Sequence, residues 1–391
     1  MQWVAQSWLI FRLTGSPLLL GLLGFAGNIP IFLLAPLGGA VTDRFCRRHI
    51  LLVTQSLAMI CSLLMALLTL LDYLQVWQIF AFALITGTIN AFDIPTHQAF
   101  LADVVDKKDL MNAISLNSSL INFTRIIGPA AAGFLIAEWG EGWCFFINSA
   151  SFIPAVIGIL LMTEIPENKS NRQHSTLFNM IEGFRIVSGH SVIRHLLLLT
   201  ALLGLIGMSF TVLLPILSGE VLQAGPNGLG QLVGAAGSGA LLAALSFAGY
   251  RNSKGLGRWI IISSIIFGFS LIFLSLSDSF RISAALLFIL GFSQVVQLDS
   301  ANKLLQSIVS NHIRGRVMAF YILVLMGLTP FGTLAAGGLA AYIGVLPTMA
   351  ICGVVYLVFA VIVVIRLLHH IRAQQAGRLY SASQPEPLDN A

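Results

Sequence analysis

Two acidic residues lie inside long apolar stretches of this sequence, and each is followed four positions later by a basic residue. The pairs are Asp93 with His97 and Asp299 with Lys303. A charged side chain inside a membrane helix is costly and usually faces the protein interior or water. Burial favours the protonated form of a carboxyl group, so each acid is a candidate proton carrier. The spacing also fits a gate or structural ion pair, which we favour because both pairs lie near helix ends. His97 adds a group of a type that titrates near neutral pH.

A second charged group is the segment Gly39–Arg48, which holds Asp43, Arg44, Arg47 and Arg48 between two apolar stretches. Such charges must lie at a membrane surface rather than in hydrocarbon. A carboxylate at a helix end can pair with an arginine or with the positive N-terminus of a neighbouring helix. We therefore predict a gating contact for Asp43, with a cluster that only sets membrane orientation as the alternative.

The composition requires membrane-spanning elements to position these groups. The chain is 57% hydrophobic and only 9% charged, with a mean hydropathy of +0.89, whereas about 25% of a soluble domain is charged. Eleven segments are long enough to cross a bilayer, at roughly 20 residues each. They are Ser16–Val41, Ile50–Leu71, Val76–Gln98, Ala113–Ala137, Trp143–Thr163, His195–Gly219, Gly228–Tyr250, Arg258–Ser277, Ile282–Leu298, Val317–Ile343 and Leu346–Leu368.

A twelfth apolar segment, Gln2–Phe11, is too short to span. No basic region precedes it, so it does not resemble a signal peptide. We interpret it as the second half of a first helix whose beginning is missing.

Lysine and arginine are distributed very unevenly among the loops. Only Arg12 and Arg281 fall in the loops on one side, and Arg125 and Lys303 lie in or near helices. The remaining basic residues fall on the other side, which the positive-inside rule places in the cytoplasm. The net charge of +5 is thereby explained without a nucleic-acid partner.

The basic side also carries the longest hydrophilic stretch. Residues 164–194 contain apolar positions at helical spacing and form a predicted cytoplasmic linker with an amphipathic helix. The linker divides the chain into a bundle over 1–163 and a second bundle over 195–370. A tail over 371–391, rich in Ser, Gln and Pro near its end, is predicted to be disordered and cytoplasmic.

The two halves resemble each other. Residues 131–140 align with residues 335–344 at a constant offset of 204, and Asp93 and His97 match Asp299 and Lys303 at an offset of 206. Repeated halves are typical of secondary transporters in which the substrate binds between the repeats near the membrane midplane.

The segment that is predicted to be the fifth span contains Arg125 followed by Gly128, Pro129 and Gly133. Pro129 removes a backbone hydrogen bond, and the glycines allow close helix contact. Arg125 is the most deeply placed cation, with Asn122 one turn before it. We favour pairing of Arg125 with an acid such as Asp93, and an anionic or catechol-like ligand is the alternative.

These motifs carry a family resemblance. Gly39–Arg48 resembles motif A of the major facilitator superfamily, with Cys46 where a second Gly is usual, and Arg125–Gly133 resembles motif C of its drug–proton antiporters. Further segments resemble the branch that contains the enterobactin exporter and macrolide-efflux proteins. They lie at residues 4–9, 13–17, 90–95, 112–118 and 315–318.

The resemblance implies an all-α polytopic membrane protein of two six-helix bundles, with eleven full spans and a half span as written. It implies a proton-coupled exporter of an amphipathic small molecule that works by alternating access. Asp43 would contact the start of the eleventh helix, near Gly315–Val317, when the cytoplasmic side is closed. Polar residues of the first, fourth, seventh and tenth helices would line the substrate cavity. The candidates are Gln6, Asn90, Thr211, Ser293, Gln294 and Gln297.

Three features depart from the family pattern. The first helix is incomplete, His97 stands where an arginine is usual, and the second copy of motif A, around residues 249–254, lacks its acid.

Other classes of function find little support in the sequence. The four cysteines show no disulfide or metal spacing, and no phosphate-binding glycine loop precedes a Lys-Ser/Thr pair. We therefore expect no enzyme activity, metal, cofactor or ATP, and a monomer in contact with membrane lipids. Two alternatives stay open: a lipid or lysolipid flippase of the same fold, and a membrane sensor or assembly partner that transports nothing.

Overall fold

A computed structural model describes residues 1–106, 109–162, 191–248, 255–309 and 311–382. The described residues form helices joined by short turns, and no strand occurs among them. The first group of helices is α1 (Gln2–Thr14), α2 (Pro17–Arg44), α3 (Arg47–Leu70), α4 (Val76–Val104), α5 (Leu110–Trp139), α6 (Glu141–Ala150) and α7 (Phe152–Leu161). The second group comprises α9 (Ser191–Leu202), α11 (Gly225–Ala248), α12 (Leu256–Ser275), α13 (Phe280–Ile308), α14 (Asn311–Ile343) and α15 (Val345–Ala382).

Local sequence signals set several helix ends. Ser16 caps α2 by accepting a hydrogen bond from the Leu19 amide, and Pro17 occupies the first helical position, which suits its fixed φ. Gly140 and Gly344 join α5 to α6 and α14 to α15 with φ values of 84° and 87°. These glycines are the last residues of the two aligned segments, so the sequence repeat is also a repeat of backbone conformation.

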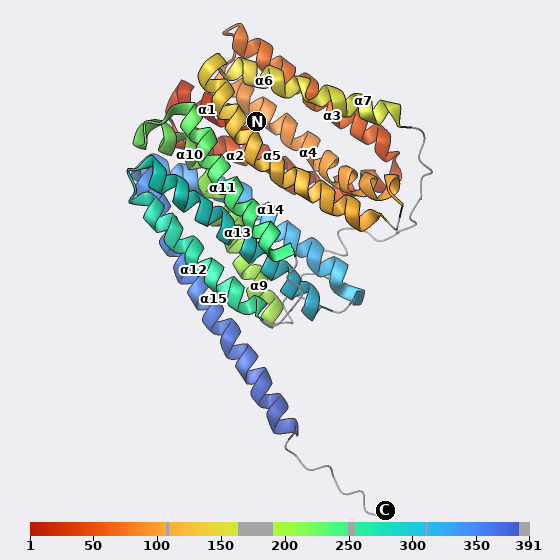
Figure 1. The fold of residues 1–391 in the computed structure, drawn as a ribbon, viewed down its shortest axis with the longest axis vertical. Coiled ribbons are helices and arrows are strands. Elements are labelled where there is room, and N and C mark those ends of the chain that lie inside the picture. The colour runs from red at the N-terminus through yellow and green to blue at the C-terminus, as the bar shows by residue number, and fades with distance from the viewer. Residues whose placement is uncertain (107–108, 163–190, 249–254, 310, 383–391) are drawn as a thin grey trace, which may run out of the picture.

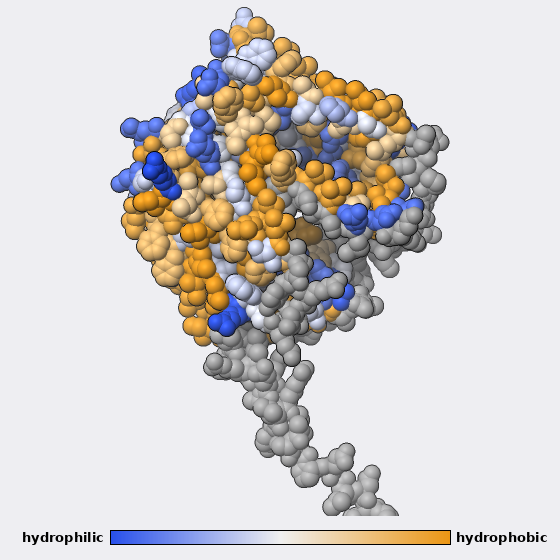
Figure 2. All heavy atoms as spheres, in the orientation of Figure 1, coloured by the Kyte–Doolittle hydropathy of each residue, from blue (hydrophilic) through white to orange (hydrophobic). Residues whose placement is uncertain are grey.

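Ten stretches of helix are long and apolar enough to cross a membrane, and this is a multi-pass membrane protein. α1, with 13 residues, and α5, with 30 residues, complete the twelve positions of the predicted fold. Figure 2 shows apolar residues over the sides of the bundles, with hydrophilic residues mostly toward the ends. Most helices run past their predicted spans, because polar residues at a membrane surface can extend a helix that the apolar stretch began.

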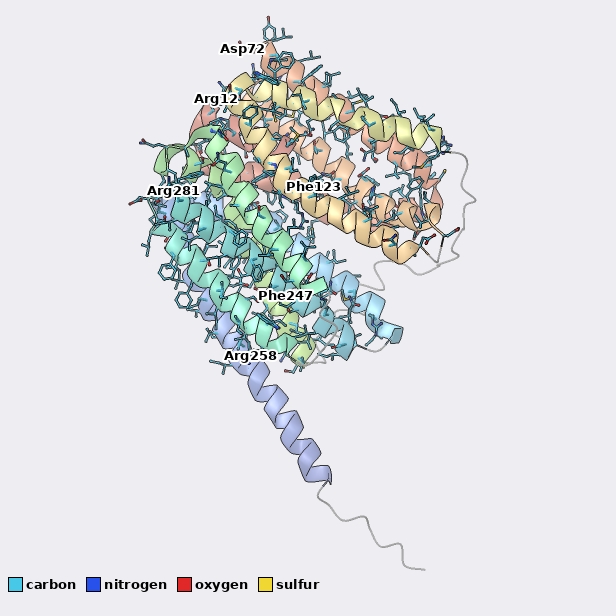
Figure 3. The ribbon with its side chains drawn as sticks, in the orientation of Figure 1. Arg12, Asp72, Phe123, Phe247, Arg258 and Arg281 are labelled. Carbon is cyan, nitrogen blue, oxygen red and sulfur yellow. The ribbon has the colours of Figure 1, made fainter. Side chains whose placement is uncertain are left out.

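The helices form two bundles, α1 to α7 and α9 to α15 (Figure 1). We call the end that carries Arg44, Arg47, Arg48 and Arg258 the basic end. The opposite end carries the turns at Gly140 and Gly344. Figure 3 shows Arg12, Asp72 and Arg281 toward the opposite end and Arg258 at the basic end.

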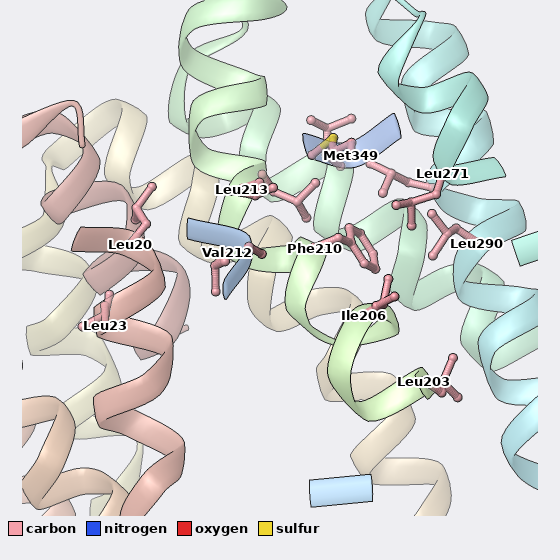
Figure 4. Close-up of a cluster of buried hydrophobic side chains, with 14 of the residues drawn as sticks. Leu20, Leu23, Leu203, Ile206, Phe210, Val212, Leu213, Leu271, Leu290 and Met349 are labelled. Carbon is pink, nitrogen blue, oxygen red and sulfur yellow. The ribbon is translucent and has the colours of Figure 1, made fainter. Parts of the chain in front are cut away.

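The predicted seventh span is an irregular helix rather than a continuous α-helix. After α9, a π-helical turn η1 (Leu203–Gly207), a 3-10 turn η2 (Ser209–Leu213), a short α10 (Leu214–Ile216) and a second π turn η3 (Leu217–Val221) complete it. Three glycines and Pro215 lie in this segment, and each weakens the regular hydrogen-bond ladder. Figure 4 shows Val212 and Leu213 of this segment in the buried cluster that also holds Leu20 and Leu23 of α2.

The last helix differs from its prediction. α15 continues to Ala382, so the predicted disordered tail is wrong for residues 371–382. Alanine, glutamine and arginine favour helix strongly, and they are frequent in this segment. Residues 383–391, and the predicted linker as far as residue 190, lie outside the described residues.

Candidate functional site

In the charged segment that follows Gly39, two arginines bind neighbouring helices, and the other two charged residues are exposed. Arg47 and Arg48 are the bonded pair, and Asp43 and Arg44 are exposed. Arg47 Nη1 lies 2.6 Å from Asp103 Oδ2, and the same atom donates to the Ala99 carbonyl at 3.4 Å. Both partners belong to the last turns of α4, whose carbonyl groups attract positive charge. Asp43 and Arg44, at the end of α2, are exposed. Among the described residues, Asp43 forms no ion pair within 4 Å.

Arg48 fastens a second helix end. It donates to the carbonyls of Ile159 at 3.0 Å and Leu160 at 2.9 Å. These are among the last residues of α7, where carbonyl groups lack partners within the helix. The two arginines therefore hold the start of α3 to two neighbours in its own bundle.

Near the end of α2, the glycine in close contact is Gly38 and not the motif residue Gly39. A Cβ atom added at Gly39 would meet nothing within 4 Å, whereas one at Gly38 would strike the Ala91 carbonyl of α4. Gly38 therefore allows α2 and α4 to approach, and Gly39 faces open space.

The predicted ion pair between Asp93 and His97 does not form. Asp93 Oδ1 accepts hydrogen bonds from Thr54 Oγ1 at 2.6 Å and Gln55 Nε2 at 2.9 Å, both on α3. His97 is exposed. Within the described part of the chain no partner of Oδ2 is found, so this carboxylate has one engaged and one unengaged oxygen.

The predicted ion pair between Asp299 and Lys303 is also wrong. Lys303 Nζ instead donates to the Phe247 carbonyl at 2.5 Å. Phe247 is the last residue but one of α11. The carbonyl groups at a helix C-terminus attract positive charge, so this carbonyl competes successfully for the ammonium group. No described cation lies within 4 Å of the Asp299 carboxylate.

A cavity of about 400 Å³ lies inside the first bundle. Three predicted residues, Gln6, Asn90 and Asp93, line it. Gln6 also donates to Met65 Sδ at 3.2 Å. The lining is rich in amides and hydroxyls that the sequence analysis did not single out: Gln2, Asn28, Thr54, Gln55, Thr86 and Asn148. Asn28 has a sequence signal, because it stands in the middle of the long apolar stretch of α2.

The cavity candidates of the second bundle do not line this space. Gln297 is buried and accepts a hydrogen bond from Tyr356 at 2.5 Å. Ser293 is also buried and donates to the Leu290 carbonyl. Gln294 Nε2 donates to the Gly207 carbonyl at 3.3 Å, and Thr211 donates to the Met208 carbonyl at 2.8 Å. The last two bonds satisfy carbonyls of the irregular segment, where the α-helical pattern breaks.

The Gly-Pro motif of α5 lies where the two bundles meet. A Cβ atom on Gly133 would lie 2.7 Å from the Pro226 carbonyl oxygen and 2.8 Å from Gly230 Cα of α11. One on Gly230 would lie 2.6 Å from the Pro129 carbonyl oxygen. Gly128 faces Met1 instead, at 3.7 Å. The glycines thus let two helix backbones touch across the bundle interface.

Arg125 differs from its prediction. Its side chain is exposed and forms no ion pair with Asp93 or with another acid among the described residues. Its carbonyl oxygen lies against Gly237 of α11, where a Cβ atom would be 2.9 Å away. Asn122 lies in α5, and its side chain falls outside the described part of the structure.

A second contact joins the bundles through α2 and α14. A Cβ atom on Gly21 would lie 2.8 Å from Gly337 Cα. Gly337 is the counterpart of Gly133 in the aligned segments, so the sequence repeat supplies a glycine to each contact. Toward the membrane middle the contact continues through Phe25, Phe32 and Phe331.

Both contacts lie in the half of the molecule next to the opposite end. From there they continue to the middle of the helices, at Gly237 with Arg125 and at Gly327 with Phe32.

Comparison with known proteins agrees with this architecture. The model of a family described as transmembrane secretion effector matches residues 1–390. The staphyloferrin A transporter of Staphylococcus aureus is 26% identical over 90% of this chain and 89% of its own length. The enterobactin exporter EntS of Shigella boydii is 22% identical, covering 97% of this chain and 87% of that protein. Macrolide efflux protein A of Streptococcus pyogenes is 22% identical, with 92% and 90% covered.

Two solved structures show the same fold. The nucleoside transporter NupG superposes with a TM-score of 0.73 at 13% identity, covering 93% of this chain and 94% of that chain. A bacterial homologue of the lysosomal transporter Spinster, in an inward-facing and occupied conformation, gives a TM-score of 0.69 at 16% identity, covering 99% and 96%.

Proposed function

Because this chain belongs to the transmembrane secretion effector family of major facilitator transporters, we propose that it exports an amphipathic small molecule by proton-coupled alternating access. One observation carries the proposal. Two repeat-related helix contacts join the bundles in the half next to the opposite end, Gly133 with Gly230 and Gly21 with Gly337. A pair of bundles held this way can rock about the membrane middle and expose a central site to each side in turn.

The orientation follows from charge. The positive-inside rule places the basic end in the cytoplasm, together with the C-terminus of the chain. We infer that this state is open to the cytoplasm of a prokaryotic cell, with the protein in the inner membrane. Relatives named as exporters of a siderophore and a macrolide support an amphipathic substrate.

Asp93 is the proposed proton carrier of the first bundle. Its Oδ1 is held by two neutral donors, and its Oδ2 is unengaged among the described groups. A carboxylate without a cationic partner gains or loses a proton without breaking an ion pair. Protonation would change the charge beside the cavity and shift the balance between the two states.

Asp43 is the proposed gate residue at the basic end. In this state it is exposed, and α14 begins in the other bundle. When the basic ends close, the carboxylate can approach the positive N-terminus of α14. Arg47 and Arg48 are bonded within their own bundle and keep the turn that carries Asp43 in place.

The test is retention of dyes, macrolides and catechol siderophores in cells that express the chain, with and without a protonophore. We expect lower retention of at least one compound, abolished by the protonophore and by Asp93→Asn. Asp72→Asn is the matched control, since this exposed acid lies in the turn between α3 and α4. Unchanged retention of every compound, with membrane insertion verified, would contradict export. Export that persists in Asp93→Asn would contradict the role of this acid alone.

A further inference from the structure

Aromatic rings of the first bundle are seated on glycines of the second bundle. The ring of Phe32, on α2, lies against Gly327 of α14, where an added Cβ atom would be 2.6 Å from both Cδ2 and Cε2. Real Cβ atoms do not approach carbon atoms this closely, so the ring occupies space that only glycine leaves free. The contact is a ring held in a notch of the facing helix.

Phe331 completes this contact from the other side. It lies one turn beyond Gly327 on α14, and its ring meets Phe32 edge-on at 6.2 Å and 82°. It also meets Phe25, two turns before Phe32 on α2, at 6.0 Å and 72°. Phe331 is therefore inserted between two rings of the opposite bundle, in the edge-to-face geometry that aromatic pairs prefer.

A second ring repeats the pattern at the opposite end. The Phe11 ring of α1 lies against Gly219 of the turn η3, and a Cβ atom there would strike its Cε1 and Cζ atoms. Trp8, on the same helix, contacts the Phe11 ring, with the ring centres 5.2 Å apart. In both places the ring comes from the first bundle and the glycine from the second.

We propose that these ring-in-notch contacts, Phe11 on Gly219 and Phe32 with Phe331 on Gly327, form a clasp that holds the transporter closed at the opposite end. The clasp must release before that end can open. Separating the bundles withdraws each ring from its notch, and Phe331 leaves the space between Phe25 and Phe32. The clasp thus influences how often the opposite end opens. Its residues shift the equilibrium between the closed and open forms of that end without contacting a proton-binding group.

The proposal of a clasp rests on the alternating access of the proposed function. Its effect on the distance between the two bundles can be measured without any substrate. Spin labels at Asp72→Cys and Asp278→Cys report the width of the opposite end, because each residue lies in an exposed turn of a different bundle. The four native cysteines are first replaced by alanine. Pulsed electron spin resonance on the purified full chain then gives the distribution of distances between the labels.

Phe331→Ala removes two ring contacts. We expect the ratio of long to short distances to rise on the order of ten-fold, given the strength of two aromatic pairs. Phe269→Ala is the matched control. Phe269 and Phe331 are both 45% exposed, but the ring of Phe269 stacks on Phe273 within its own helix. The control is expected to leave the distances unchanged.

A rescue experiment keeps the proposal testable if Phe331→Ala does not fold. Gly327→Ala places a methyl group where the Phe32 ring lies, so it should lengthen the distances as well. Adding Phe32→Ala removes the ring from that space, and it should make the Gly327→Ala change nearly neutral. The same comparison applies to the second contact, where Phe11→Ala should make the Gly219→Ala change nearly neutral.

Distances that stay the same in folded Phe331→Ala, or a Gly327→Ala effect that Phe32→Ala does not alter, would overturn the clasp. These outcomes are distinct from failure of the proposed function. Absence of export with shifted distances would contradict export and leave the clasp, whereas normal export with unshifted distances would contradict the clasp alone.

Discussion

The two contacts between the bundles use the same repeated helices but fill the space between them differently. The backbones of α5 and α11 lie against each other, from the contact at Gly133 of α5 to the contact at Gly237 of α11. A Cβ atom added at either glycine would lie against a carbonyl group. Along α2 and α14, the backbones lie against each other at Gly21, and side chains, among them aromatic rings, continue the contact. One contact is built from glycine surfaces and the other from aromatic side chains.

This difference distinguishes the features that the two halves share through the sequence repeat from the features in which the halves differ. The shared helix positions and the pair Gly133 and Gly337 follow from the repeat. The filling of the interface does not, because side chains diverge more readily than backbone paths. A backbone surface cannot rearrange to accept added atoms, whereas a ring can rotate or move aside. We therefore expect the α5–α11 contact to tolerate less change than the α2–α14 contact.

The largest effect is expected from Gly133→Ala. The new methyl group would lie 2.7 Å from a carbonyl oxygen and 2.8 Å from a Cα atom, so the helices must separate. Overpacking of this kind costs about 1–3 kcal/mol. We expect export to fall at least about ten-fold and the label distances at the opposite end to lengthen.

Gly338→Ala is the control for that change, because its nearest neighbour would be a leucine methyl 3.9 Å away. Normal export by Gly133→Ala would show that α5 and α11 can part without loss, and the proposed difference between the contacts would be wrong.

A matched pair of substitutions tests the same difference more finely. Gly24→Ala and Gly237→Ala each place a methyl group 2.9 Å from its nearest atom. At Gly24 the neighbours are side-chain atoms of Thr333 and Val212, and at Gly237 the neighbour is the Arg125 carbonyl. We expect Gly237→Ala to lower the thermal unfolding midpoint several degrees more than Gly24→Ala. Equal shifts would mean that the kind of neighbour does not matter.

A smaller effect is expected from Gln294→Leu. This change removes the donor to the Gly207 carbonyl in the irregular segment beside the α2–α14 contact. An unsatisfied carbonyl costs about 1–3 kcal/mol, reduced where water reaches it. Hydrogen exchange of residues 203–213 should quicken, and exchange in α11 should not change. Faster exchange in residues 203–213 and in α11 would contradict this prediction and show that the irregular segment also affects the α5–α11 contact.

The smallest effect is expected from Arg47→Ala, which lies away from both contacts. Its ion pair with Asp103 is partly exposed, with side-chain exposures of 21% and 22%, and such pairs contribute about 0–1 kcal/mol. We expect a slight loss of stability and unchanged label distances at the opposite end. A marked change in those distances would connect this turn to the clasp.

The sequence predicted the features that long patterns encode. Apolar length located the spans, and the offset of 204 showed that the two halves resemble each other. The aligned segments both end at a glycine with positive φ, Gly140 and Gly344. The Gly-Pro motif identified a helix that makes a close contact. The family resemblance agrees with the match over residues 1–390.

The sequence could not predict features that depend on which atoms compete in three dimensions. The spacing of Asp299 and Lys303 is correct for an ion pair, but the carbonyl of Phe247 lies within reach of the lysine and accepts its hydrogen bond. Phe11, Phe32 and Phe331 look like any of the 26 phenylalanines in the chain, and only the facing glycines distinguish them. Gly38 and Gly39 are neighbours in sequence, and the rotation of α2 decides which one meets α4.

The most direct test of alternating access measures both ends of the same protein. Labels at Asp72→Cys and Asp278→Cys report the opposite end, and labels at Phe45→Cys and Ser307→Cys report the basic end, where both side chains are exposed. We predict that Gly133→Ala and Phe331→Ala lengthen the first distance and shorten the second. Distances that change in the same direction at both ends, or at one end only, would contradict a rocking of two rigid bundles.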